Sequence, residues 1–291
     1  MQAILTRYQL RPRRRLSQHF LVDPRQADRI ADALEASPGD VVLEIGSGLG
    51  ALTLPLARRA RWVVAIERDA SLASALADIL VSHGLRPTVD LVVADALRLP
   101  LTHLKELVAS ARHEPGTVPR PQARVLVAGN LPYGITSPLL LWLVDEPGWH
   151  RAVVMVQKEV ADRLAAAPST PAYGSLTVAV ATRCRVRPLF DVSRRCFFPV
   201  PEVDSTVLQL EPLPRQLAPE ERRRLEQVLR AAFGQRRKTL RNALRSLTPD
   251  PAKVQAILDR AGVDGALRGE ALEPERLLDL ARAWAAIDGR P

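Results

Sequence analysis

Cysteine is scarce in this chain of 291 residues. Its two cysteines, Cys184 and Cys196, lie twelve positions apart, and no histidine is spaced from them as a metal partner. The sequence therefore predicts neither a disulfide framework nor a zinc site, and we expect no bound metal. Reduced cysteines suit a cytoplasmic protein, which is the location we expect.

Long apolar runs are also absent. No stretch approaches the roughly 18 apolar residues of a membrane span, and the N-terminus lacks the apolar core of a secretory signal, so we expect no membrane partner. The first 22 residues contain arginines and no acid. That composition also suits a mitochondrial presequence, but residues 13–21 overlap a different motif described below.

Acidic residues are fewer than basic residues, 32 against 41. The formal net charge is +9, with a sequence pI near 10.4, and only four of the 41 basic residues are lysines. Such a field attracts polyanions, and we expect nucleic acid rather than an anionic membrane surface. A GC-rich genome would by itself favour arginine over lysine, so the arginine excess is weaker evidence than the net charge.

Short β-branched runs alternate with segments of helical spacing from residue 41 onward. This pattern predicts an α/β fold, a Rossmann-like parallel sheet covered by helices. Two later runs, residues 186–190 and 207–210, are expected to join the sheet edge in antiparallel orientation. The other expected strands are residues 41–45, 62–67, 89–94, 125–128 and 153–156, and the expected helices between them are residues 52–59, 71–80 and 138–144.

A change in composition after Glu211 predicts a domain boundary. Pro212 and Pro214 interrupt the chain there, and everything beyond reads as helices with intervening turns. We therefore expect a basic N-terminal arm at residues 1–22, a catalytic domain at residues 23–211 and a small all-α domain at residues 212–291.

A glycine-rich turn follows the first expected strand. Gly46, Gly48 and Gly50 lie between a strand and a helix, where glycine lets the backbone approach a ligand closely. With Ala51 the turn also satisfies the dinucleotide-binding pattern, so a nicotinamide-dependent dehydrogenase remains an alternative at this point. A glycine-rich turn that binds nothing is a further alternative.

Carboxylates end the next two expected strands. Glu67 lies 21 residues after Gly46, where it could accept hydrogen bonds from both hydroxyls of a ribose. Asp95, followed by Ala96, ends the third strand at the edge where an open sheet binds its ligand, and could contact an adenine amino group. An aspartate at such a position also serves as a helix cap.

The fourth expected strand ends in Asn130-Leu131-Pro132-Tyr133. This tetrapeptide resembles the Asn/Asp-Pro-Pro-Tyr motif of methyltransferases that act on exocyclic amines of nucleobases. The Asn130 side-chain oxygen and the Leu131 carbonyl could accept the two N–H groups of an adenine N6, which favours a pyramidal amine and its developing positive charge. Tyr133 could stack on a flipped base, and Pro132 restricts Leu131 to an extended backbone.

Five further stretches resemble, in order, motifs of the ribosomal RNA adenine dimethyltransferase family. Together the resemblance covers roughly residues 11–247. The sequence of residues 236–242 is more similar to that of the branch that acts on small-subunit RNA, which is linked to kasugamycin sensitivity, than to that of the erythromycin-resistance branch. These stretches are residues 16–21 (LSQHFL), 157–163 (QKEVADR), 173–176 (YGSL), 197–205 (FFPVPEVDS) and 233–242 (FGQRRKTLRN).

The resemblance implies S-adenosylmethionine as the cofactor, with dimethylation of N6 of two adjacent adenines in the 3′-terminal hairpin loop of small-subunit (16S) rRNA. It implies that Phe197 encloses the target base opposite Tyr133. Ser17 and His19 depart from the usual glycine and asparagine, and His19 can still donate a hydrogen bond. The cofactor contacts implied by the resemblance and by the turns above are His19, Leu21, Gly46, Gly48, Glu67, Asp95, Ala96 and Asn130.

Two arginine-rich segments are candidates for RNA contact. We expect the arm to be disordered in isolation and to meet phosphates through Arg13, Arg14 and Arg15. In a helix over residues 236–247, the apolar residues would lie on one face and the basic residues on another. The apolar face would pack against the protein, and the basic face would contact solvent or RNA. The basic residues of this segment that we expect to contact RNA are Arg236, Arg237, Lys238, Arg241 and Arg245.

The expected partner is small-subunit rRNA in a 30S assembly intermediate, and nothing in the sequence indicates an obligate oligomer, so we expect a monomer. Two alternatives remain beside the dehydrogenase. One is a large-subunit rRNA methyltransferase of the erythromycin-resistance type, because a folded RNA is recognised largely by shape. The other is a ribosome-assembly factor whose RNA binding matters more than its chemistry.

Overall fold

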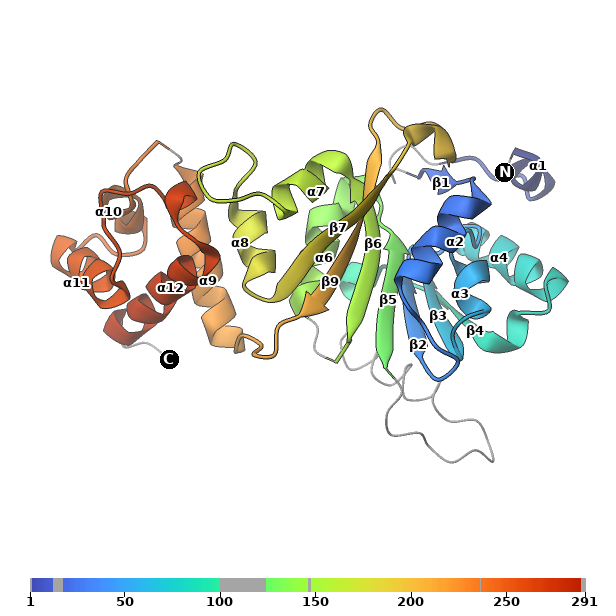
Figure 1. Cartoon of the computed structure of the whole chain (residues 1–291), viewed down its shortest axis with the longest axis horizontal. Helices are drawn as coiled ribbons and strands as arrows, with labels where there is room; N and C mark the ends of the chain where they lie inside the picture. Colours follow the sequence, from blue (N-terminus) through green and yellow to red (C-terminus); the bar gives the residue numbers. More distant parts are fainter. Residues whose placement is uncertain (1, 13–17, 100–123, 146–147, 236, 289–291) are drawn as a thin grey trace. The chain divides into compact units, whose positions relative to one another are not determined.

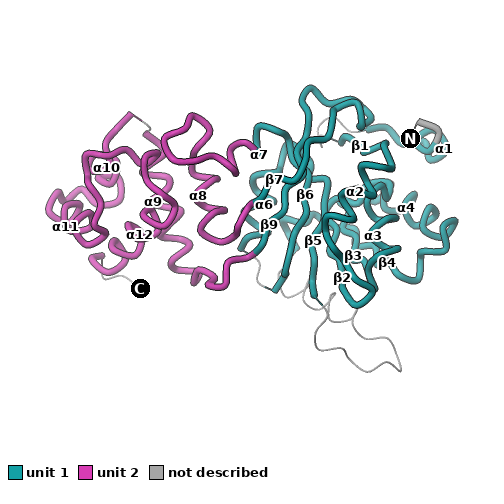
Figure 2. The backbone as a smooth tube through the Cα atoms, in the orientation of Figure 1, with its two compact units in different colours: residues 1–161, 187–211 teal, residues 162–186, 212–291 magenta. Residues whose placement is uncertain are grey.

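The computed structural model describes residues 2–12, 18–99, 124–145, 148–235 and 237–288. The chain forms two compact units, the first from residues 1–161 and 187–211 and the second from residues 162–186 and 212–291 (Figure 2). Among the described residues, no helix is long and apolar enough to cross a membrane.

A seven-stranded sheet in the order β4-β3-β2-β5-β6-β9-β7 confirms the expected α/β class (Figure 1). The first five of these strands run parallel, and β9 pairs antiparallel with β6, as expected for a late addition to the edge. The bounds are β2 Val41–Ile45, β3 Trp62–Glu67, β4 Val89–Val93, β5 Val125–Asn130, β6 Arg151–Gln157, β7 Cys184–Val192 and β9 Ser205–Pro212.

The ends of every predicted strand lie within two residues of the observed ends. The helices between the strands are α3 Thr53–Ala57, α4 Ala70–Ser82 and α6 Thr136–Asp145. Local capping explains where α4 begins, because the Asp69 side chain accepts a hydrogen bond from the Ser71 N–H. Helix α2, Pro24–Ala33, was not predicted from the sequence, and Asp23 caps it in the same way.

The core of the first unit lies between the sheet and these helices. All five residues of β2 are buried, and Val42 and Ala65 belong to the same apolar cluster as Ile30 of α2 and Leu76 of α4. Burial of a Val, Leu or Ile side chain contributes about 1.5–3 kcal/mol, so this cluster stabilises the sheet and holds the carboxyl ends of its strands in place.

The N-terminal segment is folded where it is described, which corrects the expectation of a disordered arm. Residues Gln2–Arg7 form helix α1. Leu5 is buried in a small apolar cluster with Phe20, Leu49 and Leu72. Arg13, Arg14 and Arg15 lie outside the described residues, so their predicted RNA contact stays a prediction.

The second unit is helical. Its core joins Tyr173 to the C-terminal helices, and the Tyr173 hydroxyl donates to the Leu272 carbonyl at 2.7 Å. Residues 162–186, which we assigned to the catalytic domain from the sequence, pack with the C-terminal helices, and the chain enters the second unit again at Pro212. The helices are α7 Lys158–Leu164, whose first residues belong to the first unit, α8 Ser175–Ala181, α9 Pro219–Gly234, α10 Leu240–Ala243, α11 Pro251–Ala261 and α12 Pro274–Asp288.

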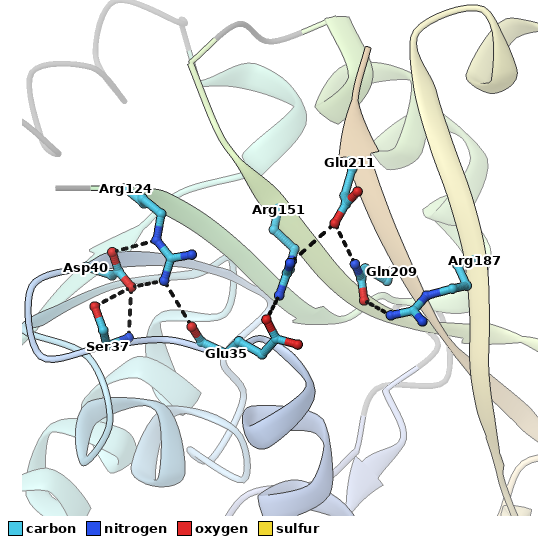
Figure 3. A network of polar contacts seen from close by, with 8 residues as sticks. All are labelled: Glu35, Ser37, Asp40, Arg124, Arg151, Arg187, Gln209 and Glu211. Carbon is cyan, nitrogen blue, oxygen red and sulfur yellow. Dashed lines mark hydrogen bonds and ion pairs between the residues drawn. The ribbon is translucent and has the colours of Figure 1, made fainter. Parts of the chain in front are cut away.

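A polar network closes the amino ends of the central strands (Figure 3). Asp40, 3% exposed, accepts hydrogen bonds from Arg124 at 2.7 and 3.1 Å and from Ser37. Burial alone would raise the pKa of Asp40, but the bonds from Arg124 and Ser37 outweigh it and lower this pKa to about 2. Arg151 pairs with both Glu35 and Glu211 beside them.

Asp40→Asn should lower stability at neutral pH and flatten its dependence on acid. A lowered folded pKa stabilises the protein above the unfolded value of 3.8, and this contribution disappears as pH falls through about 2. The difference in unfolding free energy is about 2 kcal/mol at pH 7. Urea unfolding at pH 7, 4 and 2.5 measures it, with the exposed Asp78→Asn as control. An equal acid dependence in wild type and Asp40→Asn would contradict the assignment.

Candidate functional site at the carboxyl edge of the sheet

The glycine turn after β2 has a backbone that favours glycine. Gly46, Gly48 and Gly50 have φ angles of +76°, +54° and +85°. A Cβ atom on Gly50 would lie 2.6 Å from a methyl carbon of Leu76, so this position also lacks space for a side chain. The backbone of the turn is therefore accessible to a ligand at the edge of the sheet.

Glu67, at the end of β3, ties that strand to the glycine turn. One carboxylate oxygen accepts from the Gly48 N–H at 2.9 Å and the other from the Asp69 N–H at 2.8 Å. Burial raises the pKa of Glu67, and the two N–H donors offset part of that effect. Each oxygen keeps lone-pair capacity for a further donor, which suits a pair of ribose hydroxyls.

Asp95 follows β4 and serves as a cap as well as a pocket residue. It accepts from the Leu97 N–H at 3.2 Å, beginning the short helix Ala96–Arg98. Its second oxygen lies 3.4 Å from a guanidinium nitrogen of Arg68. Asp95 therefore is a helix cap that also lines the pocket described below, and its predicted contact with an adenine amino group stays a prediction.

At the end of β5, Asn130 has a fixed amide orientation. Its Nδ2 donates to the main-chain carbonyl of His19 at 3.0 Å. Because a carbonyl accepts only from the NH₂ end of an amide, this contact leaves the side-chain oxygen of Asn130 free to accept from elsewhere. Leu131 follows, with its side chain 1% exposed and its N–H bonded to the Met155 carbonyl.

Tyr133 is held by two contacts. Its ring stacks on the His19 imidazole with centroids 5.3 Å apart, and its hydroxyl lies 2.8 Å from the Ser205 hydroxyl oxygen. Burial raises the pKa of Tyr133, so the phenol stays neutral at physiological pH. The His19 ring is itself fixed by a 2.8 Å contact between Nδ1 and the Pro199 carbonyl.

A short antiparallel pair brings the N-terminal motif to this edge. Strand β1, Phe20–Leu21, pairs with β8, Phe197–Phe198, so that Leu21 lies opposite Phe197 across 176 positions of sequence. Neither strand was predicted. Phe197 is 2% exposed in the main apolar core and does not line the pocket, so its predicted contact with a target base stays a prediction.

One pocket collects the other residues that were assigned to catalysis or to the cofactor from the sequence. It lies within the first unit, at the carboxyl ends of β2, β3, β4 and β5. Its lining includes His19, Leu21, Gly46, Gly48, Glu67, Asp95, Ala96, Asn130, Leu131, Pro132 and Tyr133.

The pocket also contains residues that sequence reasoning missed. Glu44 and Ser47 line it, are 1% and 4% exposed, and each has a side-chain oxygen without a hydrogen-bond partner among the described residues. Burial raises the pKa of Glu44 to about 7; the nearby Thr53 hydroxyl lowers it in part and Glu67 raises it further. The available signal was a single acid in the otherwise apolar run VVLEI.

The basic segment of the second unit has the predicted two faces. Leu240 and Leu244 are fully buried, while the described basic side chains on the other face are exposed. Arg236 lies outside the described residues. The exposed residues are Arg237, Lys238, Arg241 and Arg245.

Curated relatives align with nearly the whole chain. A protein of Magnetococcus marinus named ribosomal RNA small subunit methyltransferase A is 39% identical over 280 residues, which cover 96% of this chain and 94% of the relative. A protein of the same name from Rhodospirillum rubrum is 41% identical over 286 residues, covering 97% and 91%.

Solved structures of two rRNA or adenosine methylating enzymes share the fold. A dimethyladenosine transferase from Plasmodium falciparum has a TM-score of 0.73 at 25% identity, covering 92% of this chain and 98% of that one. The 23S rRNA methyltransferase ErmE has a TM-score of 0.62 at 31% identity, covering 91% and 99%.

The model of the ribosomal RNA adenine dimethylase family matches residues 9–285. This match spans both compact units and includes every described residue of the pocket. The chain therefore belongs to the ribosomal RNA adenine dimethylase family.

Proposed function

We propose that this protein uses S-adenosylmethionine to dimethylate N6 of two adjacent adenines in the 3′-terminal hairpin loop of small-subunit (16S) rRNA. The observation that carries this proposal is the orientation of Asn130, whose amide oxygen is left free beside Tyr133 in a pocket that also holds Glu67 and Asp95. The names of the curated relatives favour the small subunit as the target.

The residues present fit this cofactor. Glu67 suits a ribose, Asp95 suits an adenine amino group, and the turn at Gly46 and Gly48 gives close access to backbone. The unpartnered oxygens of Glu44 and Ser47 would accept hydrogen bonds from its amino-acid end. When bound, S-adenosylmethionine supplies a methyl group activated by a positively charged sulfur.

The chain's own contribution to transfer is to position the target amine. The lone pair of an adenine N6 is delocalised into the ring, which makes the planar amine a poor nucleophile. Asn130 Oδ1 and the Leu131 carbonyl would accept hydrogen bonds from its two N–H groups, and these bonds favour the pyramidal, nucleophilic form. Tyr133, fixed by His19 and Ser205, would present a ring face for base stacking. This arrangement needs no strong base, because the amine loses its proton only after it has become cationic.

The experiment that tests this function is transfer of labelled methyl to unmethylated small and large ribosomal subunits, followed by nucleoside analysis. We expect N6,N6-dimethyladenosine in the small subunit alone. Label in the large subunit alone would show that the protein methylates large-subunit RNA, as the 23S rRNA methyltransferase ErmE is named for doing. No label in either subunit, with RNA binding retained, would favour an assembly factor.

We further propose that the protein acts as a cytoplasmic monomer on a 30S assembly intermediate and contacts its RNA through Arg237, Lys238, Arg241 and Arg245. Support comes from the net charge of +9 and from the exposure of these four side chains opposite a buried apolar face. The contacts would be to phosphates, which position an RNA without reading its sequence.

Asn130→Ala should lower the rate of methyl transfer by at least about a hundredfold, because one preorganised acceptor for the target amine is removed. Binding of the small subunit should change little, and binding of S-adenosylhomocysteine, whose pocket Asn130 also lines, should weaken much less than the transfer rate. Single-turnover transfer and equilibrium binding measure the two effects. Transfer at the wild-type rate would contradict the assigned role of Asn130.

Arg241→Ala combined with Arg245→Ala should weaken binding to unmethylated small subunits. The slope of log K against log salt should fall by about 0.7–0.9 for each phosphate that the variant no longer neutralises. The matched control is Arg260→Ala, an exposed arginine on α11 of the same unit. Filter binding across a salt series measures both effects. An unchanged slope in the double variant would exclude these side chains from the RNA interface.

A further inference from the structure

His19, directly before β1, contacts both side chains that we assign to the target adenine. Its main-chain carbonyl accepts from Asn130 Nδ2 at 3.0 Å, and its imidazole stacks on the Tyr133 ring with an interplanar angle of 26°. The first contact uses the backbone, which every residue type provides. The second needs an aromatic side chain. The identity of residue 19 therefore bears on Tyr133 rather than on Asn130.

The His19 ring is fixed by a contact that does not involve Tyr133. Its Nδ1 lies 2.8 Å from the Pro199 carbonyl oxygen, and because a carbonyl only accepts, the hydrogen atom of this bond is on Nδ1. Pro199 directly follows β8, and the pairing of β8 with β1 holds both ends of this hydrogen bond together. The imidazole can therefore support the ring that stacks on it.

Tyr133 has a second anchor at its hydroxyl. That hydroxyl lies 2.8 Å from the hydroxyl oxygen of Ser205, which is fully buried at the start of β9. The phenol ring is thus held at one face and at its far end, by two segments that lie far apart in the sequence. Tyr133 is half-buried and lines the pocket, so the ring face turned away from His19 is the face available to a base.

We propose that His19 is a positioning residue for the target adenine, because its ring supports one face of Tyr133 while the base stacks on the other, so that three rings form one stack. This inference rests on the proposed function, which assigns base stacking to Tyr133. A ring that is already held in place loses no freedom when the base arrives. An aromatic pair of this kind favours the stacked arrangement about two- to tenfold.

Three replacements separate the ring of His19 from its hydrogen bond. His19→Phe keeps an aromatic face and loses Nδ1, His19→Asn keeps a polar donor without a ring, and His19→Ala has neither. The rate of methyl transfer to unmethylated small subunits is measured in a single turnover at saturating S-adenosylmethionine. Because His19 also lines the pocket, saturation keeps a change in cofactor affinity from lowering this rate.

We expect the rate to fall about two- to tenfold in His19→Asn and His19→Ala and to stay close to the wild-type rate in His19→Phe. Equilibrium binding of S-adenosylhomocysteine should not follow this order. The matched control is His83→Ala, which replaces an exposed histidine after α4 and should transfer methyl at the wild-type rate. Thermal unfolding checks that each variant is folded.

A double-mutant cycle shows whether His19 acts through Tyr133. In a Tyr133→Ala background the supported ring is absent, so His19→Ala should cause no further loss of rate. The labelled methyl group keeps slow transfer measurable in both variants. If His19→Phe fails to fold, this cycle still decides the proposal.

Three results would overturn the inference and leave the proposed function in place. They are a wild-type rate in His19→Ala, a faster rate in His19→Asn than in a folded His19→Phe, and an equal loss from His19→Ala with and without the Tyr133 ring. Absence of transfer to small subunits by the wild-type protein would overturn the proposed function together with the inference.

Discussion

The parallel pairing of β2 with β3 on one side and β5 on the other is the interaction on which the site depends. This register places Glu44 beside Ala65 and Ala128, so that the turn after β2, the acid that ends β3 and the tetrapeptide that ends β5 all leave the sheet at one edge. All five residues of β2 are buried, so both faces of the strand pack against the core, and a shift of one residue would exchange the side chains of the two faces. Packing of the core thus sets the geometry of the pocket.

Local pattern was enough to predict most of this edge. Five buried residues before a glycine turn identify β2, and Glu67 could be placed because a strand of six residues ends there. In a parallel sheet these ends must coincide, so the strands' order in sequence already predicts that Gly46, Glu67, Asp95 and Asn130 meet. The pocket contains all four.

Long-range pairing was the part that the sequence did not reveal. Strands β1 and β8 have two residues each, too few to show a period, and only their pairing across the fold creates them. The same pairing brings the His19 carbonyl to Asn130 and its ring to Tyr133. Phe197 of β8 reaches this edge through the same pairing, and its side chain lies in the core.

Two buried acids at the ends of β2 show how the fold separates stability from binding. Asp40, just before the strand, is bonded to Arg124 and Ser37, and its pKa lies near 2. Glu44, four residues later, has an unpartnered oxygen, and its pKa lies near 7. The difference has two causes, because Asp40 is bonded to Arg124 and Ser37, whereas Glu44 lies deeper and burial is the main influence on its pKa. A paired acid stabilises the folded chain by itself, whereas the unpartnered oxygen of Glu44 keeps a cost of burial at the edge of the pocket.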